Sequence, residues 1–348
     1  MKIDRYRFVD GYEISSLIKG GWHLAGGHGD IDPHQAVVDM AAFVDAGIDT
    51  FDCADIYTGV EELIGQFRRR HPELARRLRV HTKFVPDLQH LGVVDASYVE
   101  KIIDRSLLRL GVDQLDLVQF HWWDFSQAGY VDAAQHLERL RRKGKIVRIG
   151  VTNFDTAHLE EILDAGVGIS AHQLQYSLLD RRPQNRMVEY CVVNDIALLC
   201  YGTIAGGFLS DKWLGEPSPQ EPLANRSLFK YRLIIDEFGT WDQFQKLLVT
   251  LRRIADVYEV DIASVATKFV LQQRGVGAAI VGATSARHLD AHKKVSTFTL
   301  GQSDLSAIEL VTQSSCGPNG DVYQLERDRN GPHGRIMKYD LNDDLTAK

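Results

Sequence analysis

The chain contains the stretch Leu115-Asp116-Leu117-Val118-Gln119-Phe120-His121, an apolar run that ends on an ionisable residue. Two earlier stretches have the same form, Ile48-Asp49-Thr50-Phe51-Asp52 and Leu78-Arg79-Val80-His81-Thr82-Lys83. A helical pattern separates each stretch from the next, so the three are expected to be parallel strands whose carboxyl ends share one rim. In a (β/α)₈ barrel this rim carries the catalytic residues. The three terminal side chains are therefore expected to face a common mouth.

The same alternation of strand and helix patterns continues along residues 14–293. Eight strands are expected, the first over residues 14–21 and the last over residues 278–281, after a short hairpin that turns at Gly11. The helix after Asp32 begins with a proline, which fits the first helical position because no backbone N–H is needed there. The chain is therefore predicted to be one α/β domain over residues 1–348, a (β/α)₈ TIM barrel.

Two segments fall outside this repeat. Residues 206–241 carry Pro217, Pro219 and Pro222 and are expected to form a long loop after the seventh strand. A C-terminal helix and tail occupy residues 302–348, and the part from residue 316 is rich in Gly, Asp, Asn and Arg. Both segments follow barrel elements that would place them over the mouth, so both are expected to act as lids.

Composition argues against several classes of function. The formal net charge is −7 and the sequence has no block of basic residues, which argues against a nucleic-acid partner or an anionic membrane surface. No apolar run approaches the length of a membrane span, and the N-terminus lacks the apolar core of a signal peptide. The four cysteines lack metal-ligand spacing, so no metal is expected. Cys191 and Cys200 lie in apolar surroundings, as unpaired core cysteines do, so a reducing, cytoplasmic location is predicted. The oligomeric state is left open.

The residues expected at the mouth suit proton transfer to an oxygen atom. Tyr57 begins the loop after Asp52, and its phenol, with an ordinary pKa of about 10, needs a nearby cation to release a proton at neutral pH. Lys83 is the candidate cation, and Asp52 can pair with it because a buried charge needs a partner. His121 can add a hydrogen bond to a carbonyl oxygen. No serine or cysteine nucleophile is apparent, so the missing reagent is a hydride, which implies a nicotinamide cofactor.

Short motifs also occur in a fixed order at the ends of the predicted strands. They are Asp52-Cys53-Ala54-Asp55-Ile56-Tyr57, Thr82-Lys83, Phe120-His121, Gly150-Val151-Thr152-Asn153-Phe154, Gln173-Leu174-Gln175-Tyr176-Ser177-Leu178-Leu179-Asp180-Arg181, Tyr201-Gly202-Thr203 and Gly207-Phe208-Leu209. Any one of these motifs is weak, whereas the ordered set is specific. With this set the chain resembles the aldo-keto reductase family over about residues 16–292.

The resemblance implies a reversible, NADPH-dependent reduction of an aldehyde or ketone, with a small carbonyl compound as substrate. Tyr57 would be the general acid and Lys83 would lower its pKa. Asp52 would hold Lys83, and His121 would orient the substrate carbonyl. The nicotinamide carboxamide would be bound by Thr152, Asn153 and Gln173, and its ring would stack on Tyr201. Further cofactor contacts are implied at Gly202, Thr203, Gly207, Leu209, Gly282, Thr284, Ser285, Arg287, His288 and His292.

The phosphate-binding segment departs from the family pattern. Ile280-Val281-Gly282 stands where proline usually precedes the glycine, and His288 and His292 replace residues that are common in the family. Thr284, Ser285 and Arg287 remain plausible contacts for a 2′-phosphate. NADP(H) is therefore the predicted cofactor, with NAD(H) as the alternative.

Three alternatives stay open at this point. Trp22, Trp122 and Trp123 are expected to line the substrate pocket, but they could equally pack in the core. Thr152 and Asn153 could simply cap the helix that follows them. The whole protein could be a regulatory subunit that senses NADP(H) with little turnover, whereas a metal-dependent lyase on the same barrel would need a ligand cluster that the sequence does not offer.

Overall fold

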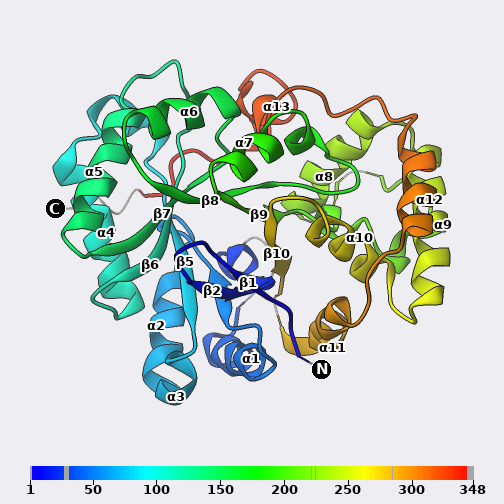
Figure 1. The fold of residues 1–348 in the computed structure, drawn as a ribbon, viewed down its shortest axis with the longest axis horizontal. Helices are drawn as coiled ribbons and strands as arrows, with labels where there is room; N and C mark the ends of the chain where they lie inside the picture. Colours follow the sequence, from blue (N-terminus) through cyan, green and yellow to red (C-terminus); the bar gives the residue numbers. More distant parts are fainter. Residues whose placement is uncertain (1, 27–30, 221, 224, 284, 343–348) are drawn as a thin grey trace.

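The computed structural model describes residues 2–26, 31–220, 222–223, 225–283 and 285–342. Its centre is a closed barrel of parallel strands in the order β10-β3-β4-β5-β6-β7-β8-β9 (Figure 1). The strand bounds are β3 Leu17–Gly20, β4 Thr50–Asp52, β5 Arg79–Phe84, β6 Leu115–Phe120, β7 Ile146–Thr152, β8 Ile169–Gln175, β9 Ala197–Tyr201 and β10 Val276–Gly282. The prediction of a (β/α)₈ barrel is confirmed.

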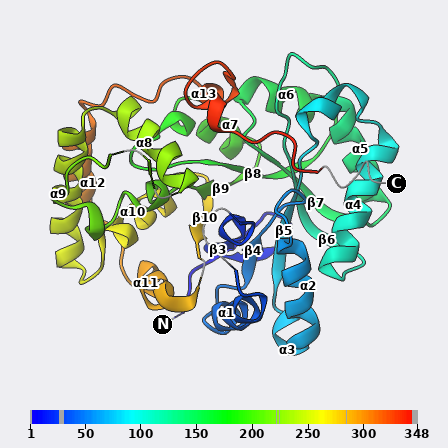
Figure 2. The same ribbon diagram turned by 180° about the vertical axis from the view of Figure 1, so that it is seen from behind.

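Helices surround this barrel, as the front and back views show (Figures 1 and 2). Their bounds are α1 Pro33–Asp45, α2 Val60–Arg70, α3 Pro72–Ala75, α4 Ala96–Leu110, α5 Tyr130–Arg142, α6 Thr156–Asp164, α7 Met187–Val193, α8 Arg226–Phe238, α9 Trp241–Val257, α10 Ile262–Leu271, α11 Leu289–Lys294, α12 Gln302–Thr312 and α13 Gln324–Arg327. The side chains of Asp32, Asp95 and Asp155 accept hydrogen bonds from backbone N–H groups in the first turns of α1, α4 and α6. Such caps satisfy donors that the helix itself leaves unpaired. In the described part of the chain, no helix is both long and apolar enough to cross a membrane.

The N-terminal hairpin closes the floor of the barrel. Strands β1 (Arg5–Arg7) and β2 (Glu13–Ser15) pair antiparallel, so Ile14 belongs to the hairpin and the barrel strand starts only at Leu17. The prediction of one strand over residues 14–21 is therefore wrong, because a bend at Ser16 separates the hairpin strand from the barrel strand. The Tyr12 hydroxyl lies 3.2 Å from His81 Nε2 inside the barrel, so the open mouth must be at the other rim.

The segment after β9 is not simply a long loop. It begins with short 3₁₀ turns, but α8 then covers residues 226–238, and the side chain of Asn225 caps its first turn. Tyr231, Ile234, Ile235 and Phe238 are buried at helical spacing. The prolines just before this helix obscured that pattern in the sequence.

The tail does lie over the mouth, as predicted. From α12 at one edge of the molecule it crosses to α13 above the barrel and continues toward α4 and α5 (Figures 1 and 2). Asp87, which follows β5, accepts hydrogen bonds from the backbone N–H groups of Leu341 and Asn342 at 3.0 Å each. The Asn342 side chain donates to the Val85 carbonyl at 2.8 Å. The tail therefore spans the mouth and is fastened on its far side.

Candidate active site

A buried ion pair forms the base of the mouth. Lys83 Nζ lies 2.8 and 2.7 Å from Asp52 Oδ1 and Oδ2, and it also donates to the Cys53 carbonyl at 2.8 Å. Lys83 is 5% exposed and Asp52 3%. Burial alone would lower the pKa of Lys83, but the touching carboxylate raises it above its ordinary value. Lys83 therefore carries a charged ammonium at neutral pH, as expected for a lysine paired with Asp52.

Two glutamines complete the shell of Asp52. Its Oδ1 accepts from Gln173 Nε2 at 2.6 Å and from Gln119 Nε2 at 3.1 Å. Gln119 was missed in the sequence, although it lies two residues before His121 and so shares the strand face that points inward. Gln173 is expected to bind the nicotinamide carboxamide, but in this arrangement its amide nitrogen donates to the Asp52 carboxylate and holds it in place.

The phenol of Tyr57 lies above the ion pair. Its ring centroid is 4.8 Å from Lys83 Nζ, and the Trp22 ring packs edge-on against it at 5.1 Å. Burial raises the pKa of Tyr57, while Lys83 opposes this through its charge and a hydrogen bond, and the net pKa lies above the ordinary value. Lys83 therefore lowers the pKa of Tyr57, as expected, but desolvation outweighs the ammonium. The phenol stays protonated at neutral pH, which suits a proton donor.

His121 is held in one tautomer. Its Nδ1 lies 3.0 Å from the carbonyl oxygen of Thr152, which can only accept, so Nδ1 carries the hydrogen. Burial lowers the pKa of His121 to about 3, with a further lowering by the charges of Arg327 and Lys83. The neutral ring therefore has its lone pair on Nε2, which has no hydrogen-bond partner among the described residues. This differs from the expected donation to a carbonyl oxygen, because Nε2 in this tautomer can only accept.

The residues expected to bind nicotinamide gather at the ends of β7, β8 and β9. The Asn153 N–H donates to the Gln173 carbonyl at 2.9 Å, and the Tyr201 hydroxyl donates to Asn153 Oδ1 at 2.8 Å. Asn153 adopts φ 61°, a left-handed conformation that asparagine tolerates better than most residues. Asp155, and not Thr152 or Asn153, supplies the side chain that caps α6. The capping alternative for the earlier pair is thus removed.

The turn after β9 can contact a cofactor through its backbone more than through its side chains. Gly202 has φ 73°, and a Cβ there would lie 2.3 Å from the Tyr231 hydroxyl, so only glycine fits. Gly207 also has a positive φ, of 102°. The side chains of Thr203 and Leu209 are buried in the core. Any contact that these two residues make with a cofactor would therefore involve their main chain.

The predicted phosphate segment follows β10. Gly282 lies against His23, where a Cβ would approach the imidazole to 2.4 Å. Ser285 precedes a 3₁₀ turn over residues 286–288, and in this turn Arg287 Nε donates to His288 Nε2 at 2.9 Å. Thr284 lies outside the described residues.

His292 has a different environment from the rest of that segment. Its ring packs 6.1 Å from the Phe43 ring, and burial lowers its pKa to about 4. This neutral imidazole packs against a side chain of α1. The structure therefore does not present His292 as an exposed cation for a phosphate group.

The three tryptophans divide into two groups. Trp22 contacts Tyr57, and the Trp123 ring meets the His121 ring at 4.3 Å and 88°. Trp122 is fully buried, and its Nε1 donates to the carbonyls of Asp124 and Gln127 at 3.1 and 3.0 Å. The prediction that Trp122 lines the pocket is wrong. Side chains alternate past the end of β6, so His121 and Trp123 share a side and Trp122 points into the helix layer.

Three residues of the tail also reach the mouth, and none of them was predicted from the sequence. The Tyr323 ring lies 5.6 Å from the His121 ring, and the Tyr339 ring lies 5.1 Å from Trp123. Arg327 donates to backbone carbonyls on the loops after β6 and β7. No local pattern in the tail indicates these long-range contacts. Among the described residues, no group of three or more His, Cys, Asp or Glu side chains could hold a metal ion.

The chain is similar to known proteins of one family. The model of the Aldo/keto reductase family matches residues 16–312. The NADH-specific methylglyoxal reductase of Escherichia coli (strain K12) is 24% identical, over 84% of this chain and 93% of that protein. Aldo-keto reductase YhdN of Bacillus subtilis (strain 168) is 26% identical, over 88% of this chain and 92% of that protein.

Solved structures show the same fold. The glycerol dehydrogenase AKR11B4 of Gluconobacter oxydans superposes with a TM-score of 0.78 at 21% identity, covering 91% of this chain and 98% of that one. An aldo/keto reductase of Klebsiella pneumoniae in complex with NADP and acetate gives 0.69 at 22% identity, covering 91% and 97%. Since the family model spans most of the sequence, this chain belongs to the Aldo/keto reductase family.

Proposed function

We propose that this protein is an oxidoreductase that reduces an aldehyde or ketone to an alcohol, reversibly, with NADP(H) as its cofactor and NAD(H) as the alternative. The observation that carries the proposal is the buried Lys83–Asp52 pair at 2.7 Å beneath the phenol of Tyr57. Such a pair is costly to bury, and its position beside a protonated phenol gives it a chemical use.

Tyr57 is the proposed proton donor. A hydride added to a carbonyl carbon leaves negative charge on the oxygen, and the Tyr57 hydroxyl gives its proton to that oxygen to form the alcohol. The resulting tyrosinate is stabilised by the Lys83 ammonium, 4.8 Å from the ring. Asp52 keeps Lys83 charged throughout. In the reverse direction the tyrosinate accepts the alcohol proton.

His121 is proposed to recognise the substrate through a hydrogen bond. Because Nδ1 is committed to Thr152, the free Nε2 accepts a hydrogen bond instead of donating one. A substrate with a hydroxyl near its carbonyl group could supply that hydrogen. Trp22 and Trp123 would form the walls on either side.

The polar groups at the strand ends support a nicotinamide cofactor. Asn153 and Gln173 offer amide groups for the carboxamide, and Tyr201 offers a ring beside the glycine turn. When bound, this group supplies the hydride. The Klebsiella pneumoniae structure contains NADP, and the Escherichia coli relative is described as NADH-specific, so both forms occur among similar proteins. Arg287 beside Ser285 supports the phosphorylated form, since a guanidinium suits a phosphate.

A second candidate function is a regulatory subunit that senses NADP(H). One observation favours it: Tyr323 of the tail is 6% exposed and packs against His121, which narrows access to the mouth. The complete acid set favours turnover instead.

The test is a fluorescence titration with NADPH and NADH, followed by steady-state assays on a panel of aldehydes and ketones with the cofactor that binds more tightly. Saturable turnover supports the enzyme. Tight cofactor binding without turnover on any carbonyl, together with cofactor-dependent capture of a partner protein, would favour the regulatory subunit.

A further inference from the structure

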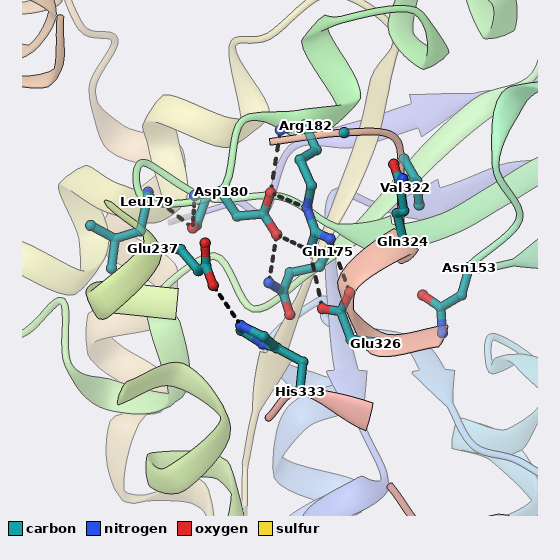
Figure 3. A network of polar contacts seen from close by, with 12 residues as sticks. Asn153, Gln175, Leu179, Asp180, Arg182, Glu237, Val322, Gln324, Glu326 and His333 are labelled. Carbon is teal, nitrogen blue, oxygen red and sulfur yellow. Dashed lines mark hydrogen bonds and ion pairs between the residues drawn. The ribbon is translucent and has the colours of Figure 1, made fainter. Parts of the chain in front are cut away.

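A buried ion-pair network ties the C-terminal tail to the barrel (Figure 3). Its tail residue, Glu326, lies outside residues 16–312, the part matched by the family model. Arg182, which follows β8, donates to the two carboxylate oxygens of Glu326 at 2.9 and 3.0 Å. The same guanidinium donates to both oxygens of Asp180 at 2.9 and 2.7 Å. All three side chains are at most 2% exposed. Because separating such a pair would strand a buried charge, the network fixes α13 over the mouth.

The residue after Glu326 reaches the loops that carry proposed site residues. Arg327 Nη1 donates to the carbonyl oxygens of residues 122 and 123, at 2.5 and 2.9 Å. Its Nη2 donates to the carbonyl oxygen of Asn153 at 2.7 Å. Residue 122 directly follows His121, and Asn153 directly follows Thr152, whose own carbonyl accepts from His121. One guanidinium therefore joins the ends of β6 and β7.

Asn153 needs this support because its backbone is unfavourable for a non-glycine residue. With φ at 61°, its peptide groups must be held from several sides. Gln173 accepts from its N–H, Tyr201 donates to its side chain, and Arg327 donates to its carbonyl oxygen. Figure 3 shows Asn153 beside the short helix that carries Glu326. The tail thus holds the backbone of Asn153, the residue that is proposed to bind the nicotinamide carboxamide.

Arg327 is not placed to bind a substrate itself. Its guanidinium carbon lies 3.9 Å from the centroid of the Phe125 ring, which is stacked on His158 at 3.7 Å. The Nη atoms serve backbone carbonyls, and Nε has no partner among the described residues. Five donors in a rigid plane can hold several carbonyls at fixed angles, which the single nitrogen of a lysine cannot do.

We propose that Arg327 is a positioning residue for the nicotinamide end of the site, and that the Glu326–Arg182 pair holds it in place. It fixes the backbone of Asn153 together with the loop after His121. The nicotinamide and the carbonyl substrate are thereby held in the correct positions relative to each other. This inference rests on the proposed function, because it assigns the cofactor to that part of the mouth.

The test compares Arg327→Met with Arg329→Met in the full chain. Methionine keeps an unbranched side chain against Phe125 but removes the donors. Arg329 lies in the same tail, has a side chain that is 54% exposed and pairs with Asp124 at the surface, so it is a matched control. Fluorescence titration measures the Kd of NADPH and of 2′-phospho-ADP-ribose, the same dinucleotide without nicotinamide. NADH and ADP-ribose replace them if NADH is the tighter ligand.

In Arg327→Met, the Kd of NADPH should rise about tenfold and kcat should fall about ten- to a hundredfold, since small misplacements near reacting atoms have effects of this size. The Kd of 2′-phospho-ADP-ribose should stay within about twofold of the wild-type value, and Arg329→Met should match the wild type throughout. If Arg327 had a merely structural role, its replacement would weaken the binding of NADPH and of 2′-phospho-ADP-ribose to the same extent. If Arg327→Met does not fold, Arg327→Lys is used, with the same pattern expected in weaker form.

Unchanged NADPH affinity and kcat in Arg327→Met would overturn the proposal. Equal weakening of both ligands would overturn it too, because the whole site would then have loosened. A wild-type protein that binds neither nucleotide would refute the proposed function itself, before any variant is compared.

Discussion

Lys83 Nζ lies 2.7 Å from Asp52 Oδ2 at the base of the barrel mouth, and both side chains are buried. The Asp52 carboxylate is shared, since it also accepts from Gln119 and Gln173. Its negative charge is therefore directed away from the mouth, whereas the ammonium is directed toward the Tyr57 ring. This asymmetry lets the pair favour a tyrosinate while remaining neutral as a whole.

Replacing Tyr57 with phenylalanine should reduce kcat by about a thousandfold, because general acid catalysis contributes factors of this order. The phenyl ring keeps the contact with Trp22, so the Kd of NADPH should change by less than about twofold. Steady-state assays and fluorescence titration measure the two effects. Retention of most of the activity in this variant would remove Tyr57 from the proposed role.

Replacing Lys83 with methionine should change both stability and pH dependence. Asp52 is left as an unpaired buried charge, so the free energy of unfolding should fall by about 3–5 kcal/mol, measured by urea denaturation. Lys83 lowers the pKa of Tyr57, so its removal raises that pKa further. Alcohol oxidation requires the deprotonated phenol, and the rise of kcat/KM with pH should therefore move to higher pH.

The double variant Asp52→Asn, Lys83→Met is the control for this experiment. It removes both charges, so most of the lost stability should return while activity stays low. A double variant as unstable as the single one would show that packing, and not the stranded charge, explains the loss.

The barrel and the grouping of Asp52, Tyr57 and Lys83 at its mouth could be predicted because their signals are local. The strand that carries Lys83 and the strand just before His121 show their register within a few residues, and glycines mark the helix ends. The tail contacts could not be predicted, since Tyr323 and Arg327 meet His121 and Asn153 across long stretches of sequence. The tautomer of His121 depends on the Thr152 carbonyl, which the sequence alone cannot place.

Trp122 and Trp123 are adjacent in sequence but should respond differently to phenylalanine. Trp122→Phe removes a fully buried indole that donates to two carbonyls, so the free energy of unfolding should fall by about 2–4 kcal/mol with little change in KM. Trp123→Phe alters the wall beside His121, so KM should rise several-fold at nearly unchanged stability. Urea denaturation and substrate titration test both expectations. Equal KM effects in the two variants would contradict the assignment of Trp122 to the helix layer.

Hydroxyacetone and 2-butanone test the tautomer of His121, because a methyl group in 2-butanone replaces the hydroxyl of hydroxyacetone. If Nε2 accepts a hydrogen bond, the wild type should prefer hydroxyacetone, and His121→Phe should reduce the ratio of the two kcat/KM values by about tenfold. Intrinsic reactivity differs between these ketones, but it cancels when the ratio is compared between wild type and variant. Methylglyoxal, which offers a second carbonyl and no hydroxyl, should gain nothing from His121. If His121→Phe lowered kcat/KM only for methylglyoxal, the hydrogen would have to lie on Nε2. Nδ1 would then not donate to the Thr152 carbonyl, and the tautomer described above would be wrong.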